Sequence, residues 1–416
     1  MKYIKQVLGG ELRQFTMVIA LVVLIIAFNI MSGGRMITPS NFQNLLFGNA
    51  YVFVLAIGML MVIVIGQIDL AVGSIAGFSG MVMALAARDF NLPWWVAVLV
   101  SLAVGAIAGS WQGFWLSKLG IPGFITTLGG QLIFRGGVIW ISGSISVPAP
   151  QELRLFGAGS LPDFGREQTG LNNATMLLGA IAIAAFAWGQ FRRRVRTEKL
   201  SGKTEALWPV LARIVLIGGV IGYVSWLFAS GRPGTSFPIP GLILVALIIV
   251  YHTITQRTRF GRHIYAVGGN KNAAALSGVN VPKTYFLTML NMSLLAALAG
   301  ILFVGRSTAA GPMDGSGWEL DAIASVFIGG AAVSGGIGTV LATMIGGLVM
   351  AVLNSGLMLM GVGSDRTQVI KGLVLLAAVA FDVYNKQQGR PSILGRLFPG
   401  KESKEATDAK GAKGAQ

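Results

Sequence analysis

The sequence predicts an all-α, polytopic integral membrane protein with about twelve transmembrane helices, within a range of roughly 10 to 12. Of its 416 residues, 54% are hydrophobic and only 12% are charged, whereas soluble domains carry about 25% charged residues. The mean hydropathy is +0.70. The apolar residues gather in runs close to the roughly 20 residues that a helix needs to cross a bilayer. Together these observations indicate a helical bundle embedded in a membrane.

Twelve apolar runs have the length of a membrane span. They lie near residues 14–31, 46–66, 70–87, 94–117, 121–141, 172–191, 207–229, 241–256, 286–305, 320–335, 338–360 and 366–384. The eighth and tenth runs are short. Because the number of spans is even, both chain termini are expected on the same side of the membrane.

The positive charges predict which side that is. Of the 32 Lys and Arg residues, twenty-two fall on the side of the termini and seven on the opposite side. Short loops rich in Lys and Arg stay in the cytoplasm, so the topology is predicted to be N-in and C-in. The net charge is +16, but the basic residues do not form a stripe interleaved with aromatic residues, so no nucleic-acid partner is expected.

The chain divides into a transmembrane domain, 1–385, and a tail, 386–416. The tail contains Lys, Gly, Ala and Glu with few apolar residues. Such a composition cannot bury a hydrophobic core, so a disordered cytoplasmic tail is expected.

A basic loop at 257–285 separates two apolar runs and is predicted to be cytoplasmic. Within it, Asn270 can N-cap a short helix over 271–277. Gly278 follows at the position where a left-handed C-terminal stop belongs. A short capped helix in a cytoplasmic loop either presents itself to a partner or lies on the lipid surface.

Motifs for catalysis, nucleotide binding or metal binding are missing from the sequence. The segment 201–204 reads SGKT, but Thr197 stands where a phosphate-binding loop needs its first glycine. The chain has no cysteine and two histidines, without the spacing of a metal site. It is therefore predicted to have no catalytic residues, no metal and no cofactor of its own.

Asp69 is flanked by Ile68, Leu70 and Val72, and it also lies at the boundary of a predicted span. An intramembrane carboxylate can bind an ion or proton. A residue at the end of a span can equally cap a helix or accept a buried hydrogen bond. Both interpretations are open at this point.

Six segments, in this order along the chain, carry a resemblance to a known family. They read GQIDLAVGS (66–74), TRFGRHIYAVGGN (258–270), AAALSGVNV (273–281), LAALAGILFVGR (295–306), ELDAIASVFIGG (319–330) and VIKGLVLLAAVAFD (369–382). Together they resemble the inner-membrane permease family of bacterial sugar ABC importers, which handle ribose, xylose, arabinose and galactose.

The resemblance implies a role for the cytoplasmic loop. In such importers a helix of the permease fits a cleft on a separate ATPase, which uses ATP and Mg. Here the contact helix would be 271–277. The residues expected to couple to the ATPase are Gly261, Arg262, Gly268, Gly269, Asn270, Ala273, Leu276 and Gly278. A periplasmic sugar-binding protein, membrane lipid and a second copy of the permease are the other partners implied, in a bacterial inner membrane.

Polar residues within or beside the apolar runs are candidates for the sugar path. They are Asp69, Ser74, Asn291, Asp321, Asn354 and Gln368. The segment 172–230 looks like an inserted helix pair around a basic cytoplasmic loop. A comparable insertion is associated with xylose-type permeases, so a pentose such as xylose is the expected cargo. A secondary sugar–proton symporter and a non-transporting scaffold are the competing hypotheses.

Overall fold

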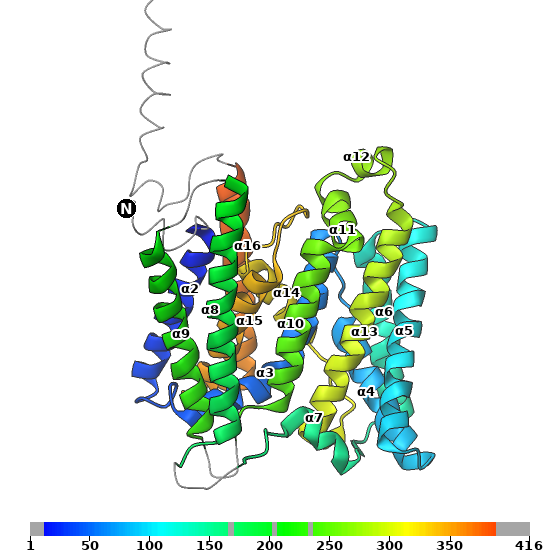
Figure 1. Ribbon diagram of the computed structural model, residues 1–416. Coiled ribbons are helices and arrows are strands. Elements are labelled where there is room, and N and C mark those ends of the chain that lie inside the picture. Colours follow the sequence, from blue (N-terminus) through cyan, green and yellow to red (C-terminus); the bar gives the residue numbers. More distant parts are fainter. Residues whose placement is uncertain (1–11, 165–169, 202–205, 232–235, 388–416) are drawn as a thin grey trace, which may run out of the picture.

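The computed structural model describes residues 12–164, 170–201, 206–231 and 236–387. Long helices dominate it and lie side by side in a bundle (Figure 1). They are α2 (Leu12–Met31), α3 (Pro39–Val64), α4 (Val72–Asp89), α5 (Trp94–Lys118), α6 (Gly123–Ser142), α8 (Asn173–Ser201), α9 (Leu207–Ala229), α10 (Ile239–Arg257), α13 (Val281–Ser307), α15 (Val340–Leu359) and α16 (Ser364–Gln387). The short elements are β1 (Val147–Pro148), η1 (Gln151–Leu153), α7 (Arg154–Ala158), α11 (Arg259–Gly269), α12 (Lys271–Leu276), β2 (Ala309–Ala310) and α14 (Trp318–Ile328).

The all-α prediction is confirmed, and each of the twelve apolar runs contains a helix. Among the described residues, eight helices are long and apolar enough to cross a membrane: α3, α5, α6, α8, α9, α10, α13 and α15. The tenth run differs from the expectation of a helix over 320–335. There α14 has 11 residues, a length of about 16 Å against a bilayer core of about 30 Å. The helix stops because Gly330, which has a φ of 83°, turns the chain away.

α3 forms the centre of the bundle, because its sequence is apolar on every side. In its most apolar window 83% of the residues are buried, as expected for a helix surrounded by others. α10, α13, α14 and α15 pack around it. Among the described helices, α5 and α13 pack most extensively, and Gly105, Gly109 and Gly113 of α5 face α13 at four-residue spacing. Small residues at this spacing let two membrane helices approach closely.

Two sets of four helices run in opposite directions. α3 and α13 are antiparallel, since Arg306 near the end of α13 donates to the Gly48 carbonyl near the start of α3. Each is followed by a non-helical link, 65–71 and 308–317, and then by a shorter helix. α4 packs along α13, and α14 packs along α3. The sets α3–α6 and α13–α16 therefore have the arrangement of an inverted repeat.

The segment 172–230 forms the helix pair α8–α9 at the edge of the bundle (Figure 1). Only 11% of the apolar window of α8 and 17% of that of α9 are buried. The Asn172 amide donates to the Ala229 carbonyl at 3.1 Å, which closes the base of the pair. The basic end of α8 lies at the same end of the bundle as α11 and α12.

The predicted tail, 386–416, overlaps the end of α16, which runs to Gln387. Residues 388–416 lie outside the described part of the chain, so the expectation of disorder there is untested.

Candidate coupling helices and broken-helix junction

The basic loop between α10 and α13 folds into two helices, α11 and α12, at one end of the bundle (Figure 1). α11 begins where the Thr258 hydroxyl accepts a hydrogen bond from the Gly261 amide at 3.2 Å. Phe260, Ile264 and Val267 then follow at spacings of four and three, so they share one helix face. Ile264 and Val267 are buried against the bundle. This periodicity was the signal for α11, which the prediction of a single helix over 271–277 missed.

α12 is the helix that the sequence predicts, within one residue. The Asn270 side-chain oxygen accepts from the Ala273 amide at 2.9 Å, so Asn270 is its N-cap. Gly278, with a φ of 84°, ends it. Of its side chains, Ala274 faces the protein, whereas Ala273 is exposed and Leu276 is 91% exposed. The helix therefore presents a large apolar side chain to its surroundings.

Glycines let α11 approach the bundle. A methyl group on Gly268 would collide with the Val64 carbonyl oxygen at the end of α3. A methyl group on Gly261 would collide with the Ile254 carbonyl oxygen of α10. By contrast, Gly269 faces open space. The exposed Arg262 donates to the Arg257 carbonyl at 3.2 Å.

The loop between α14 and α15 joins this contact. The Gly336 amide donates to the Val64 carbonyl at 2.8 Å. The Tyr265 hydroxyl of α11 donates to the Gly338 carbonyl at 2.7 Å. Burial raises the pKa of Tyr265, so its hydroxyl keeps the proton that it donates. α11 is thus tied both to the end of α3 and to the loop after α14.

The two short helices α4 and α14 meet at their N-termini, which we call the broken-helix junction. A methyl group on Gly73 would collide with the Gly315 carbonyl oxygen. Trp318, at the start of α14, packs against Tyr51 with ring centroids 4.2 Å apart. Because Tyr51 lies at the middle of α3, the junction lies near mid-bundle. Broken helices at this depth are the binding sites of many membrane transporters.

Asp69 of the link 65–71 lies at this junction and is fully buried. One carboxylate oxygen accepts from the Ala71 amide at 2.8 Å, two residues along the chain, as in an Asx turn. The other faces the Gln112 amide without the geometry of a hydrogen bond. Within the described residues Ser74 Oγ also has no hydrogen-bond partner. Asp69 therefore accepts a buried backbone hydrogen bond in the turn before α4, whose N-cap is Ala71, and its second oxygen has no hydrogen-bond partner among the described residues.

Glu319 enters the junction from α14. Its Oε1 accepts from Gln131 Nε2 of α6 at 3.1 Å, while its Oε2 has no hydrogen-bond partner in the described part of the chain. Arg135, one turn further along α6, donates to the Asp314 carbonyl at 2.9 Å. The positive ends of α4 and α14 and this guanidinium balance the buried carboxylates. Neither Gln131 nor Glu319 is among the six predicted path residues, since their contact joins positions 188 residues apart.

The six predicted path residues do not form one site. Asp69 and Ser74 lie at the junction. Asn291 accepts from the Tyr251 hydroxyl at 2.6 Å between α13 and α10.

The other three are associated with the last three helices. Asp321 accepts from Lys371 of α16 at 2.9 Å, and Asn354 of α15 approaches the same carboxylate. Gln368 is exposed on α16. The ion pair between Asp321 and Lys371 explains how a buried carboxylate is accommodated there.

Among the described residues, no group of three or more His, Asp or Glu side chains is placed to hold a metal ion.

Comparison with known proteins gives a consistent set of matches. The family described as "Branched-chain amino acid transport system / permease component" matches residues 41–379. The xylose transport system permease protein XylH of Haemophilus influenzae is 35% identical, over 91% of this chain and 98% of that protein. XylH of Escherichia coli K12 is 34% identical, over 91% and 93%. The ribose import permease protein RbsC of the same organism is 32% identical, over 89% and 93%. No solved structure matches the chain.

Proposed function

Because the chain belongs to the family of branched-chain amino acid transport system permease components, we propose that it is the membrane subunit of an ATP-driven monosaccharide importer. The chain is a multi-pass inner-membrane permease, and its relatives are named as permeases rather than enzymes. In the proposal, a separate ATPase hydrolyses ATP with Mg, and this chain moves the sugar. A periplasmic binding protein delivers the sugar to a pair of permeases.

A pentose is the proposed cargo. Two of the relatives above are named for xylose and one for ribose, both five-carbon sugars. The additional helix pair α8–α9, which the family resemblance associates with xylose-type permeases, favours xylose.

The observation that carries the proposal is α12. A six-residue helix with a 91% exposed leucine at its tip is costly for a protein to leave in water. Helix-in-groove recognition uses apolar anchors of this kind. In the proposal, Leu276 and Ala273 enter a cleft of the ATPase, and closure of the ATPase moves α11 and α12 as a unit.

The contacts behind α11 supply a route for that motion. α11 is tied to the end of α3, where the link 65–71 begins, and to the loop that follows α14. Both routes lead to the broken-helix junction. We propose that α4 and α14 separate there during transport, so that Asp69, Ser74 and Glu319 can accept or donate to sugar hydroxyls. For the other four predicted path residues, contact with the sugar stays a prediction: Asn291, Asp321, Asn354 and Gln368.

The substitution Leu276→Asp tests the coupling. It is expected to abolish copurification of the ATPase and ATP-dependent pentose uptake into vesicles, because it places a charge in an apolar cleft. Membrane insertion should be unchanged, since the side chain contacts little of its own protein. Wild-type uptake by this variant would contradict the role of α12.

A sugar–proton symporter is the second candidate, and the complete burial of Asp69 favours it. The two functions differ in their energy source. Uptake by vesicles that hold a proton gradient without ATP or ATPase would establish the symporter. Uptake that needs both ATP and a copurified ATPase would exclude it.

A further inference from the structure

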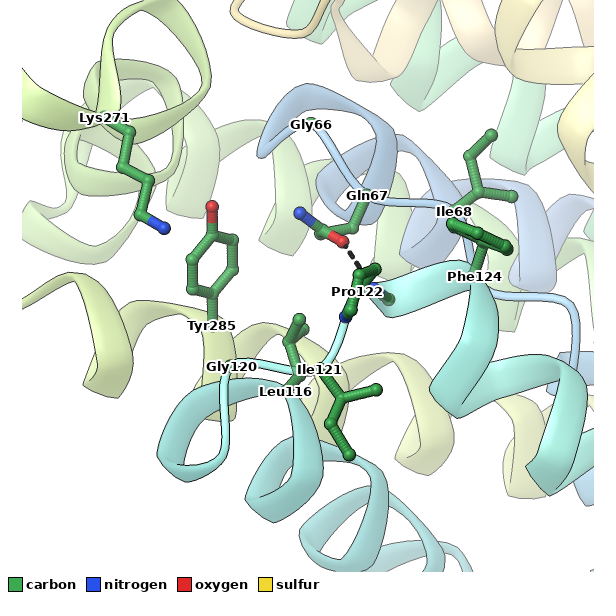
Figure 2. A pocket seen from close by; sticks show the side chains of 11 residues that line it. Gly66, Gln67, Ile68, Leu116, Gly120, Ile121, Pro122, Phe124, Lys271 and Tyr285 are labelled. Atoms are coloured by element: carbon green, nitrogen blue, oxygen red, sulfur yellow. Dashed lines mark hydrogen bonds between the residues drawn. The ribbon is translucent and has the colours of Figure 1, made fainter.

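A cavity of about 440 Å³ lies between α12 and the membrane helices. Its walls come from three places: the link after α3, the turn between α5 and α6, and the start of α12 with the first turns of α13 (Figure 2). The volume falls within the range of small-molecule sites, about 300–1,000 Å³. The sequence analysis assigned nothing to it, because its walls are distant in the chain.

Three polar side chains converge on this cavity, and each offers a donor. Lys271 Nζ lies 5.6 Å from the centroid of the Tyr285 ring. The Tyr285 hydroxyl points into the same space, as Figure 2 shows. Gln67 uses its Oε1 to accept from the Gly123 amide at 3.0 Å, and Figure 2 shows its amide nitrogen turned toward Tyr285. The oxygen of Gln67 is therefore occupied, and its NH₂ group, one of whose two N–H donors can reach the Tyr285 hydroxyl, is the part that faces the cavity.

The backbone at the start of α6 also contributes positive partial charge to the cavity. Gly123 is the first residue of α6, a helix of 20 residues, so the positive end of its dipole faces the cavity. The lining residues include no Asp or Glu. The remaining wall is apolar: Ile68, Leu116, Ile121 and Phe124. With the Lys271 ammonium, several hydrogen-bond donors and no carboxylate, the cavity favours an anion. The apolar wall favours an anion that also carries a carbon skeleton.

We propose that this cavity is a cytoplasmic binding site for a small organic phosphate ester. A phosphate offers several acceptor oxygens to donors that arrive from different directions, and Lys is a common partner for it. The ester is either a soluble sugar phosphate or the headgroup of an anionic lipid, which share this chemistry. Its occupant would touch both the base of α12 and the link 65–71. The site does not depend on the proposed import function, since it is built from this chain alone.

The binding test uses the full chain in detergent, equilibrium dialysis and radiolabelled ribose 5-phosphate, with free ribose as the comparison. Wild-type protein should bind the phosphate at one saturable site per chain, should bind it less tightly as salt rises, and should not bind free ribose there. In the second arm, native mass spectrometry measures retention of phosphatidylglycerol after extraction from mixed vesicles. Binding in the first arm identifies a soluble ester and retention in the second a lipid headgroup.

Substitutions in the lining distinguish ligand binding in this cavity from a general effect on the stability of the protein. Lys271→Gln removes the charge and should weaken binding about tenfold, as expected for a charge-assisted hydrogen bond. Gln67→Glu keeps the acceptor for Gly123 but turns a carboxylate oxygen toward the ligand, so it should abolish binding. Lys283→Gln, the same change outside the lining, should leave affinity unchanged. Thermal midpoints equal to wild type show that each variant is folded.

The proposal is overturned if wild-type protein neither binds ribose 5-phosphate nor retains the anionic lipid. It is also overturned if Lys271→Gln and Gln67→Glu bind as wild type does, because the ligand would then occupy another place.

Discussion

At the scale of single residues, Gly268 and Gly269 are neighbours in one helix with opposite surroundings. A methyl group on Gly268 meets the Val64 carbonyl oxygen, whereas one on Gly269 meets nothing within 4 Å. Gly268→Ala should therefore destabilise the protein by about 1–3 kcal/mol, the usual cost of overpacking. Gly269→Ala is the control and should unfold like wild type. Thermal unfolding in detergent measures both, and equal midpoints would show that α11 does not press on α3.

Asp69 shows what a sequence can predict about one residue. Its apolar neighbours indicated burial, which is confirmed. Of the structural roles, the buried hydrogen-bond acceptor is the one observed, because one oxygen accepts from the Ala71 amide while α4 has no side-chain cap. The functional role stays a prediction, and the second oxygen has no partner among the described residues. Its position beside Gln112 and Glu319 was out of reach, since those side chains come from α5 and α14.

At the scale of elements, α12 depends on its cap. A helix of six residues is marginal on its own. Asn270→Ala removes the bond to the Ala273 amide and should cost about 1 kcal/mol. Hydrogen exchange at 273–276 should then rise about fivefold, while α11 keeps its protection. Asn272→Ala, an exposed asparagine in the same helix, is the matched control. Equal hydrogen-exchange rates at 273–276 in both variants would mean that α12 is stabilised by the helices that flank it, α11 and α13, and not by its cap.

The elements that the sequence predicted well were those set by local pattern: the long apolar helices and the cap and stop of α12. α14 was mispredicted because hydropathy does not distinguish a helix from an apolar loop after Gly329 and Gly330. That loop is stabilised by contacts to Val64 and Tyr265, which lie far away in the chain. The cavity beside Lys271 was also beyond prediction from local sequence pattern, since three segments that are distant in the chain enclose it.

At the scale of the whole molecule, the pair α8–α9 is separable from the rest. Its ends are joined by the hydrogen bond from the Asn172 amide to the Ala229 carbonyl. Because the pair contributes two spans, deleting it leaves the orientation of the following spans unchanged. Deleting 173–227 with a short Gly-Ser linker should leave α12 in the cytoplasm. Phe228 is retained because its ring packs against Phe42 and Phe237.

The native chain has no cysteine, so Ser277→Cys provides a single label on α12. A membrane-impermeant maleimide should label it in inside-out vesicles and not in intact cells, both with and without the deletion. Labelling of intact cells by the deletion variant alone would show that α8–α9 sets the topology.

The joint behind α11 and α12 combines the Tyr265 side chain with main-chain atoms, which are the carbonyl of Val64, the amide of Gly336 and the carbonyl of Gly338. Main-chain groups are the same in every sequence, so this joint does not depend on which side chains cover the outer face of α12. In the proposed coupling, recognition of the partner and transmission of its motion therefore use different atoms. Substitutions on the outer face of α12 would then change which partner is bound and leave the contacts behind α11 unchanged.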